Sequence, residues 1–374
     1  MSLNEVISNP EPIELKVITP LFLGNAYQDD INIMNSQSEL RPPSLKGVLR
    51  FWHRAANPDN LNTEAEYFGN TDGQGCFLLQ VENPLITREP QKWEYKLGYL
   101  GYGPIMRDKK SKELQSRQYI KPGETLKLRL VFRPDASAKA KEAVFRSFRL
   151  LNLFGGLGSR SRRGFGSVIL EKDMPTDVSE LISQIRSELV QYVSQRESKY
   201  TAISQLTRVV IPFVKTSWEE ALESIEQIMH KYRSSDKFEQ DVDLVKQYLE
   251  NGTIEVSPQR VSFGLPHNYS FVDIKRNVTI EPFHSQYSRR ASPLFIHVHE
   301  LGDKRFAVVV SFFPAPLLPK GISLQVKEVA NNERKVQTIK KYCTVPTPED
   351  LAPVNEFMDY LRNLKGAQEV NWRS

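Results

Sequence analysis

The sequence predicts an α+β protein of more than one domain, whose first half forms a βαββαβ unit. Two observations carry this prediction. The chain has 374 residues, which is long for one typical domain and suits two. Its first half alternates segments of strand and helix periodicity in the order strand, helix, strand, strand, helix, strand.

The first two elements follow from alternation and capping. Residues 13–19, IELKVIT, alternate apolar and charged side chains as a half-buried strand does. A long connection then runs from Pro20 to Pro43. Ser44 is predicted to be the N-cap of a helix over residues 45–56.

The remaining elements complete the unit. Residues 76–83 and 124–134 read as strands, the second with leucines at alternate positions. A helix is expected over 138–154, because its apolar residues recur with helical spacing, and 167–173 closes as a strand. This order is that of the ferredoxin-like unit, a four-stranded sheet with two helices on one face, which RNA-recognition domains also use.

Composition excludes several classes of protein. Apolar residues make up 40% and aromatic residues 10% of the chain, which is too much for a disordered protein. The start has no basic region followed by an apolar stretch, and the longest strongly apolar run, FAVVVSFF, falls far short of the roughly 18 residues of a membrane span. Cys76 and Cys343 alone form neither a disulfide framework nor a cysteine-rich zinc site. We therefore expect a cytoplasmic protein without a metal or cofactor.

Positive charge is concentrated in one region. The net charge is only +5, yet residues 101–170 hold sixteen lysines and arginines against five acidic residues. Like charges held together repel one another unless a polyanion relieves them. A solvated surface of helices and loops is the alternative interpretation.

A glycine- and arginine-rich loop, GGLGSRSRRGFGS, fills residues 155–167. Glycine lets main-chain N–H groups approach phosphate oxygens, and arginine adds forked charged donors. Dinucleotide sites and P-loops run strand, loop, helix, whereas the order here is helix, loop, strand. No GK[ST] is present either, and both observations argue against a mononucleotide-binding enzyme. The predicted contact residues of this loop are Gly156, Gly158, Arg160, Arg162, Arg163, Gly164 and Gly166.

The first helix is predicted to have one apolar and one cationic face. Leu45, Val48, Leu49 and Trp52 form the buried stripe, and the other face holds Lys46, Arg50, His53 and Arg54. Gly47 costs the helix about 1 kcal/mol relative to alanine, so we expect a ligand to approach the backbone there, unless Gly47 packs against the sheet. The free N–H groups from Ser44 to Gly47 suit an anion.

These motifs resemble the RAMP superfamily of CRISPR systems, and within it the large tandem-RAMP subunit that heads the type III-B (Cmr) effector complex. The S-x-K-G-x-x-R pattern falls on Ser44, Lys46, Gly47 and Arg50, and the glycine-rich loop on residues 156–166. GLPHNYSF (264–271) and RRASPLFIHV (289–298) extend the resemblance. It implies two tandem ferredoxin-like units that bind guide or target RNA, through the phosphate backbone, among other subunits of the complex.

The division expected from the resemblance is a first domain over residues 1–175 and a second over 176–374. In the second we expect a strand at 206–214, helices across 217–250 and a hairpin between Leu294 and Phe313. This half has no matching G-x-G loop, so Arg289 and Arg290 are assigned to RNA binding in its place.

Two other functions stay open at this stage. Metal-free RNA cleavage needs a histidine, for which His53 or the pair His297 and His299 could serve, whereas metal-dependent cleavage could use Asp29 and Asp30, since related RAMP subunits carry an acidic residue in that loop. A protein-binding scaffold could use the connection over 20–43 or the tyrosine-rich segment 95–106, which could also stack on RNA bases.

Overall fold

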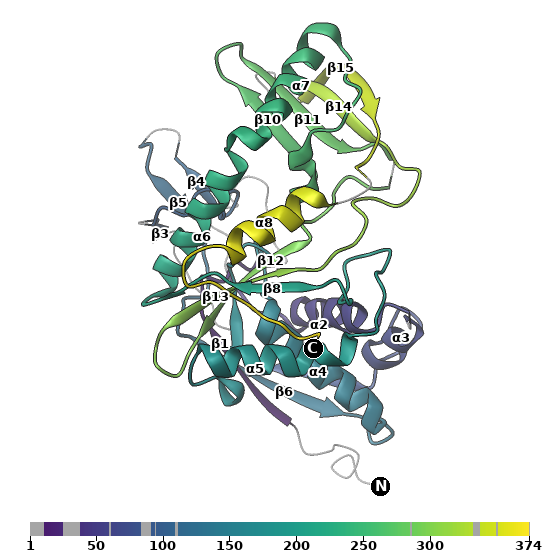
Figure 1. Cartoon of the computed structure of the whole chain (residues 1–374). Coiled ribbons are helices and arrows are strands. Elements are labelled where there is room, and N and C mark those ends of the chain that lie inside the picture. The colour runs from purple at the N-terminus through teal and green to yellow at the C-terminus, as the bar shows by residue number, and fades with distance from the viewer. Residues whose placement is uncertain are drawn as a thin grey trace.

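The computed structural model describes residues 11–24, 38–59, 61–83, 91–93, 95–108, 111–284, 286–331, 337–348 and 351–373. The molecule is elongated, with the N-terminal sheet at one end and a separate small sheet at the other (Figure 1). No helix in these ranges is long and apolar enough to cross a membrane.

The first sheet has the strand order β2-β6-β1-β7, with all pairs antiparallel. Its strands are β1 (Glu11–Val17), β2 (Phe77–Val81), β6 (Thr125–Phe132) and β7 (Val168–Leu170). The helices α2 (Pro42–Ala56) and α4 (Ala138–Phe154) pack side by side on it and share its core. Because β6 lies between β1 and β2, this is the split βαβ arrangement of a ferredoxin-like unit, and the element order predicted for the first half is confirmed.

A second sheet repeats this topology. It has the order β12-β13-β8-β16, with β9 (Val214–Lys215) paired to the start of β13. Along the chain the order is β8 (Arg208–Ile211), α6 (Trp218–Arg233), β12 (Leu294–Glu300), β13 (Phe306–Phe312), α8 (Ala352–Arg362) and β16 (Gln368–Glu369). The third strand again lies between the first two, and the predicted hairpin is β12–β13.

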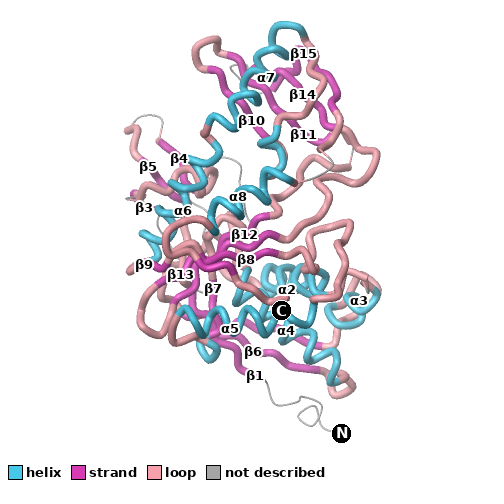
Figure 2. The backbone as a smooth tube through the Cα atoms, in the orientation of Figure 1, coloured by secondary structure: helices cyan, strands magenta, loops and turns pink. Residues whose placement is uncertain are grey.

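Insertions enlarge both units. A third sheet, β10-β11-β14-β15, forms the far end of the molecule together with α7 (Glu239–Asn251) (Figure 2). Its strands are β10 (His267–Phe271), β11 (Arg276–Pro282), β14 (Leu324–Asn331) and β15 (Gln337–Val345). In the first half a small sheet of β3 (Gln91–Lys92), β5 (Leu114–Ser116) and β4 (Ile105–Arg107) is inserted between β2 and β6. The helices α3 (Asn62–Phe68) and α5 (Val178–Leu189) are also additional to the two units.

Several predicted boundaries differ from the structure, most clearly those of α2 and β7, and the strand expected over 206–214 is divided into β8 and β9. Helix α2 begins at Pro42, with Arg41 as the N-cap, so Ser44 is inside the first turn and is not the cap. Proline at the first helical position is pre-organised for a helix and has no N–H to leave unpaired, which explains the earlier start. Strand β7 ends at Leu170 and is followed by a turn of 3₁₀-helix over 171–173. Residues 25–37 of the long connection lie outside the described residues.

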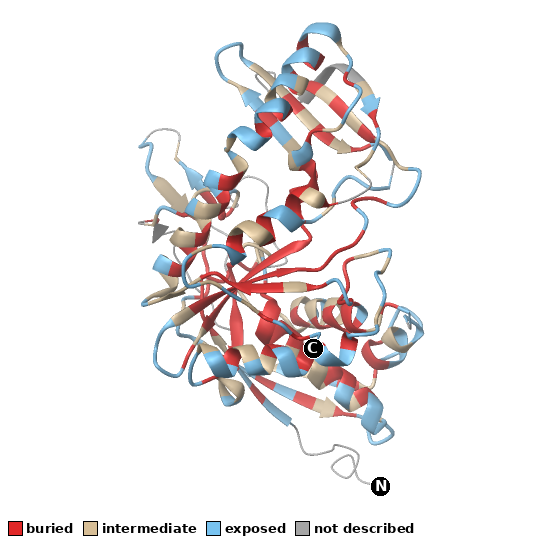
Figure 3. Ribbon diagram, in the orientation of Figure 1, coloured by how far each residue is buried: buried red, intermediate tan, exposed pale blue. Residues whose placement is uncertain are grey.

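The two halves share an apolar core. Strands β12 and β13 are buried along nearly their whole length (Figure 3). The rings of Phe295 and Phe313 from this hairpin pack with Trp52 of α2 and Phe154 of α4. The predicted division at residue 175 stays a prediction.

Candidate nucleic-acid interface

The glycine loop lies in the seam between the two halves. It leaves the end of α4, and its Ser159 and Gly166 amides donate to the carbonyls of Phe22 and Pro20, just after β1. On its other side, the Ile296 amide of β12 donates to the Arg162 carbonyl over 3.2 Å. The loop is therefore fixed on both sides before any ligand is considered.

The structure gives a packing reason for the glycines. Gly158, Gly164 and Gly166 have positive φ of 75°, 84° and 64°, which favours glycine. A Cβ on Gly158 would lie 2.2 Å from the Phe22 carbonyl oxygen, and one on Gly166 would lie 2.0 Å from that of Leu157. Gly156 is similarly confined by carbonyl oxygens at 3.0–3.1 Å. Contacts within the protein thus account for these glycines, and main-chain contact with RNA stays a prediction.

The loop arginines are held by aromatic rings and neutral acceptors. The Arg162 guanidinium lies 4.4 Å from the ring centroid of Phe295 and 5.2 Å from that of Phe51, and its Nη1 donates to the Ser292 carbonyl over 2.6 Å. Burial, followed by the charge of Arg290, lowers the pKa of Arg162 to about 10. Arg162 is therefore still cationic at neutral pH, with no acidic partner among the described residues.

Arg163 and Arg160 lie on either side of it. Arg163 Nη1 is 3.0 Å from the sulfur of Met229, a weak acceptor, and burial, with Arg233 as the next cause, lowers the pKa of Arg163 to about 10. The Arg160 guanidinium lies 6.0 Å from the centroid of the Tyr102 ring, which is 69% exposed. Both arginines thus present N–H donors that few protein acceptors use.

These side chains line one large cavity of about 820 Å³. We call it the arginine cleft and define it by five guanidinium groups, those of Arg160, Arg162, Arg163, Arg233 and Arg290. No acidic residue lines it, and within the described part of the chain no carboxylate forms an ion pair with any of the five. Partly buried like charges without counter-charges repel one another, and an external polyanion would relieve that repulsion.

Arg162 connects the arginine cleft to two further cavities. One, of about 160 Å³, lies between α2 and the loop and is lined by Gly47, Phe51 and Gly156 among others. The other, of about 500 Å³, includes Arg54, Arg289 and Arg290. The two predicted motifs and the predicted arginine pair therefore meet around a single side chain.

The cationic face of α2 is only partly available. Arg50 donates to the Phe68 carbonyl over 2.9 Å and to that of Gly69, and Arg54 forms an ion pair with Glu64 at 3.4 Å, while Lys46 lies over the Phe77 ring at 4.8 Å. The contacts of Arg50 and Arg54 come from α3 and Gly69, which were not predicted, whereas Phe77 belongs to β2.

His53 was wrongly placed on that face. It is only 3% exposed, its Nε2 lies 3.1 Å from the Thr63 hydroxyl, and burial lowers the pKa of His53 to about 4, so it is neutral. Gly47, in contrast, is exposed and has no atom within 4 Å of a Cβ position, so the alternative that it packs against the sheet is wrong.

The predicted arginine pair of the second half consists of one exposed arginine and one that is hydrogen-bonded within the protein. Arg289 is exposed, whereas Arg290 donates from Nε to the Leu317 carbonyl and from Nη1 to the Thr201 hydroxyl, both over 3.0 Å. The sequence analysis missed Arg233, which faces the same cleft from the end of α6. Its only sequence signal is a basic residue near a predicted helix end, and many helices carry one.

The candidate catalytic groups do not assemble into a site in the described ranges. His297 and His299 are fully buried, and burial lowers their pKa values to about 3 and about 4. No group of three or more metal-ligating side chains occurs among the described residues. Asp29 and Asp30 lie outside them.

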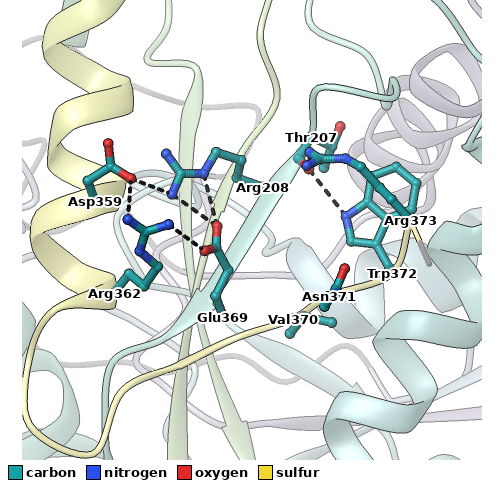
Figure 4. A pocket seen from close by; sticks show the side chains of 9 residues that line it. All are labelled: Thr207, Arg208, Asp359, Arg362, Glu369, Val370, Asn371, Trp372 and Arg373. Atoms are coloured by element: carbon teal, nitrogen blue, oxygen red, sulfur yellow. Dashed lines mark hydrogen bonds and ion pairs between the residues drawn. The ribbon is translucent and has the colours of Figure 1, made fainter.

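A cavity of about 480 Å³ near the C-terminal end provides a useful contrast (Figure 4). Its two central arginines are neutralised, because Arg208 pairs with Asp359 and Glu369 at 2.9 and 3.0 Å, and Arg362 pairs with the same two carboxylates at 3.4 and 3.5 Å. An anion entering this network would compete with carboxylates already present. The arginine cleft has no such competitor among the residues that line it.

Comparison with known proteins shows what the chain is similar to. The sequence pattern of the RAMP superfamily matches residues 14–169, from β1 to β7. CRISPR system Cmr subunit Cmr1-1 of Pyrococcus furiosus is 24% identical over 298 residues, which cover 75% of this chain and 82% of that protein. The crystal structure of Cmr1 from Pyrococcus furiosus, in its apo form, aligns with a TM-score of 0.55 and 19% identity over 97% of this chain and 99% of the other. A chain from the type III-B Cmr-beta structure bound to cognate target RNA covers 43% of this chain and 57% of its own length at 16% identity, with a TM-score of 0.30, too low to define a shared fold. Residues 14–169 therefore match the RAMP superfamily, and the chain is similar over most of its length to a Cmr subunit of a CRISPR system.

Proposed function

We propose that the chain is an RNA-binding subunit of a type III-B CRISPR effector complex, and that it binds guide RNA, target RNA or both through the phosphate backbone. The observation that carries the proposal is the arginine cleft, where five guanidinium groups meet without an acidic partner among the described residues. The similarity to Cmr1 supports the place in the complex. The partners of the chain would then be RNA and the other subunits.

Phosphate is the anion that fits this chemistry best. A guanidinium offers five N–H donors in a planar fork that matches two phosphate oxygens, and its bonds to an anion are stronger in a partly desolvated cleft than in water. The connected cavities around Arg162 suit a chain of phosphates more than a single one. Nothing in this set of contacts reads a base edge, so sequence specificity would come from guide pairing.

Salt-dependent RNA binding by the purified chain tests the proposal. Binding through phosphates weakens with added salt, by a log–log slope of about −0.7 for each phosphate neutralised on a single strand. Arg162→Ala with Arg163→Ala should lower the affinity and make the slope shallower by up to about 1.4, the contribution of two phosphates. The affinity should depend little on RNA sequence.

The matched control is a pair of arginines that already have acidic partners. Arg129 and Arg133 of the β6 region are half-exposed and pair with Glu82 and Asp135. Arg129→Ala with Arg133→Ala removes the same charge from the same half of the chain and should change the slope little. Because the guanidinium of Arg162 packs against the rings of Phe51 and Phe295, melting temperatures must accompany these measurements. Equal effects of the two pairs, or a flat salt dependence of the parent protein, would contradict the proposal.

A further inference from the structure

Arg233 is bound to the fold mainly through neutral groups. From the end of α6 its Nη1 donates to the Tyr99 hydroxyl over 2.6 Å, and its guanidinium carbon lies 5.2 Å from the ring centroid of Phe263. Its Nε is buried and has no partner in the described part of the chain. The carbonyl of Arg233 is already bound by Arg260 Nε at 2.9 Å, so stabilisation of this helix end does not depend on the Arg233 side chain.

His267 lies beside Arg233 on the same wall of the arginine cleft. Its Nδ1 is 3.5 Å from Arg233 Nη2. A guanidinium has donors only, so Nδ1 acts as the acceptor and the ring proton is on Nε2. Burial, followed by the charges of Arg233, Arg260 and Arg163, lowers the pKa of His267 to about 3, which keeps the ring neutral. His267 thus adds an N–H donor to the cleft without adding a charge.

Arg163 approaches the same wall from the glycine loop. The charge of Arg233 contributes, after burial, to the lowered pKa of Arg163, and no carboxylate lines the cleft between them. Two cations and a neutral N–H donor therefore converge from three separate segments. From this geometry we infer that Arg163, Arg233 and His267 form a phosphate subsite that binds one backbone phosphate of an unpaired RNA segment.

The size of the cleft favours an unpaired segment over a duplex. A cavity of about 820 Å³ is in the range of small-molecule sites and has room for about one or two nucleotides. Phosphates of an A-form duplex are fixed on a wide rigid cylinder, whereas a single strand can bend a phosphate inward and leave its base outside. Tyr102, exposed beside Arg160, offers such a base a ring for stacking.

The inference rests on the proposed function and is tested by comparing one RNA oligonucleotide alone and annealed to its complement. Arg233→Gln should weaken binding of the unpaired RNA about tenfold, because a charged hydrogen bond is lost, and should make the salt slope shallower by about 0.7. Binding of the duplex should change by less than about twofold. Lys231→Gln is the matched control, since Lys231 is an exposed cation on the same helix turn, and it should leave both affinities within about twofold.

The results separate the subsite from the proposed function. If Arg233→Gln behaves like Lys231→Gln while the Arg162 and Arg163 double variant loses affinity, the subsite is wrong and RNA binding stands. If neither affects binding, both proposals fail. Equal losses for unpaired RNA and duplex would overturn the preference for a single strand.

A measurement on the unmodified protein covers the case in which Arg233→Gln does not fold. RNA containing 4-thiouridine should crosslink under ultraviolet light to peptides that hold Tyr99, Tyr102 or residues 263–268, which border the subsite. Crosslinks confined to other surfaces would overturn the inference without any substitution.

Discussion

Gly164→Ala provides a sharp test of why the loop is rich in glycine. Gly164 has a φ of 84°, and a Cβ there would lie 2.5 Å from Leu222 Cδ2 and 3.2 Å from Ile296 Cγ2. Leu222 belongs to α6 and Ile296 to β12, so the added methyl group would press the loop away from the second half. Both side chains are fully buried and have little room to move.

The expected cost has two parts. A residue with a Cβ in the left-handed region costs about 1–2 kcal/mol, and overpacking a well-filled site costs about 1–3 kcal/mol more. The free energy of unfolding should therefore fall by about 2–5 kcal/mol, a large part of the about 5–15 kcal/mol typical of a folded protein. Gly252→Ala is the matched control, because Gly252 also has a φ of 84° but no atom within 4 Å of its Cβ position. It should cost only the backbone part, about 1–2 kcal/mol.

Urea unfolding followed by circular dichroism measures both variants. The packing explanation requires Gly164→Ala to have the lower midpoint at an unchanged slope. If Gly164→Ala costs no more than Gly252→Ala but weakens RNA binding, the loop needs glycine for ligand access and the packing explanation is refuted.

Two further predictions follow from the acidic and imidazole groups. Asp29→Ala with Asp30→Ala should leave RNA binding intact and remove no cleavage activity; magnesium-dependent RNA cleavage that this pair of changes abolishes would establish an endonuclease instead. Because burial lowers the pKa values of His297 and His299 to about 3 and about 4, the unfolded chain takes up protons before the folded one as the pH falls below about 6.5. Above that pH both histidines are neutral in the folded and the unfolded chain, and the stability does not depend on their titration. Between about pH 6.5 and 4 the free energy of unfolding should fall by up to about 1.4 kcal/mol per pH unit for each histidine. Urea midpoints at several pH values measure this fall. His297→Asn should reduce this dependence, and a midpoint that stays constant down to pH 4.5 would contradict the reasoning.

Local periodicity predicted the repeated parts of the fold well. The helix expected over 138–154 has those bounds in the structure, and the alternating leucines of β6 are buried as expected. Both predictions rest on the packing of one apolar face against its neighbours in the fold. The pattern that marks such a face is set by residues close together in the sequence. The burial of His53 did not follow, because it is caused by α3, an inserted helix whose Tyr67 and Phe68 cover the imidazole. If only apolar residues are assigned to the buried face of a helix, a histidine at the edge of that face is wrongly placed in solvent.

The sequence shows that the loop is rich in glycine, but it does not show why glycine is needed there. A positive φ beside a phosphate and a positive φ beside a carbonyl oxygen of the same chain demand the same residue, so the sequence could not distinguish them. Arg233 was missed for a related reason. Its role depends on a contact between the inserted segment around Tyr99 and the end of α6, more than 130 residues later.

The pairing of charges, more than their number, sets the expected salt dependence. Several cations of the basic region 101–170 are already neutralised in the structure, since Arg149 pairs with Glu142 and Glu188, and Arg133 pairs with Asp135. The five guanidinium groups of the arginine cleft combine partial burial with the lack of a described acidic partner. Five neutralised phosphates would give a slope of about −3.5, whereas sixteen would give about −11. A measured slope much steeper than −3.5 would mean that paired arginines leave their carboxylates to bind RNA, or that undescribed residues contribute, and the arginine cleft would then be only a minor part of the interface.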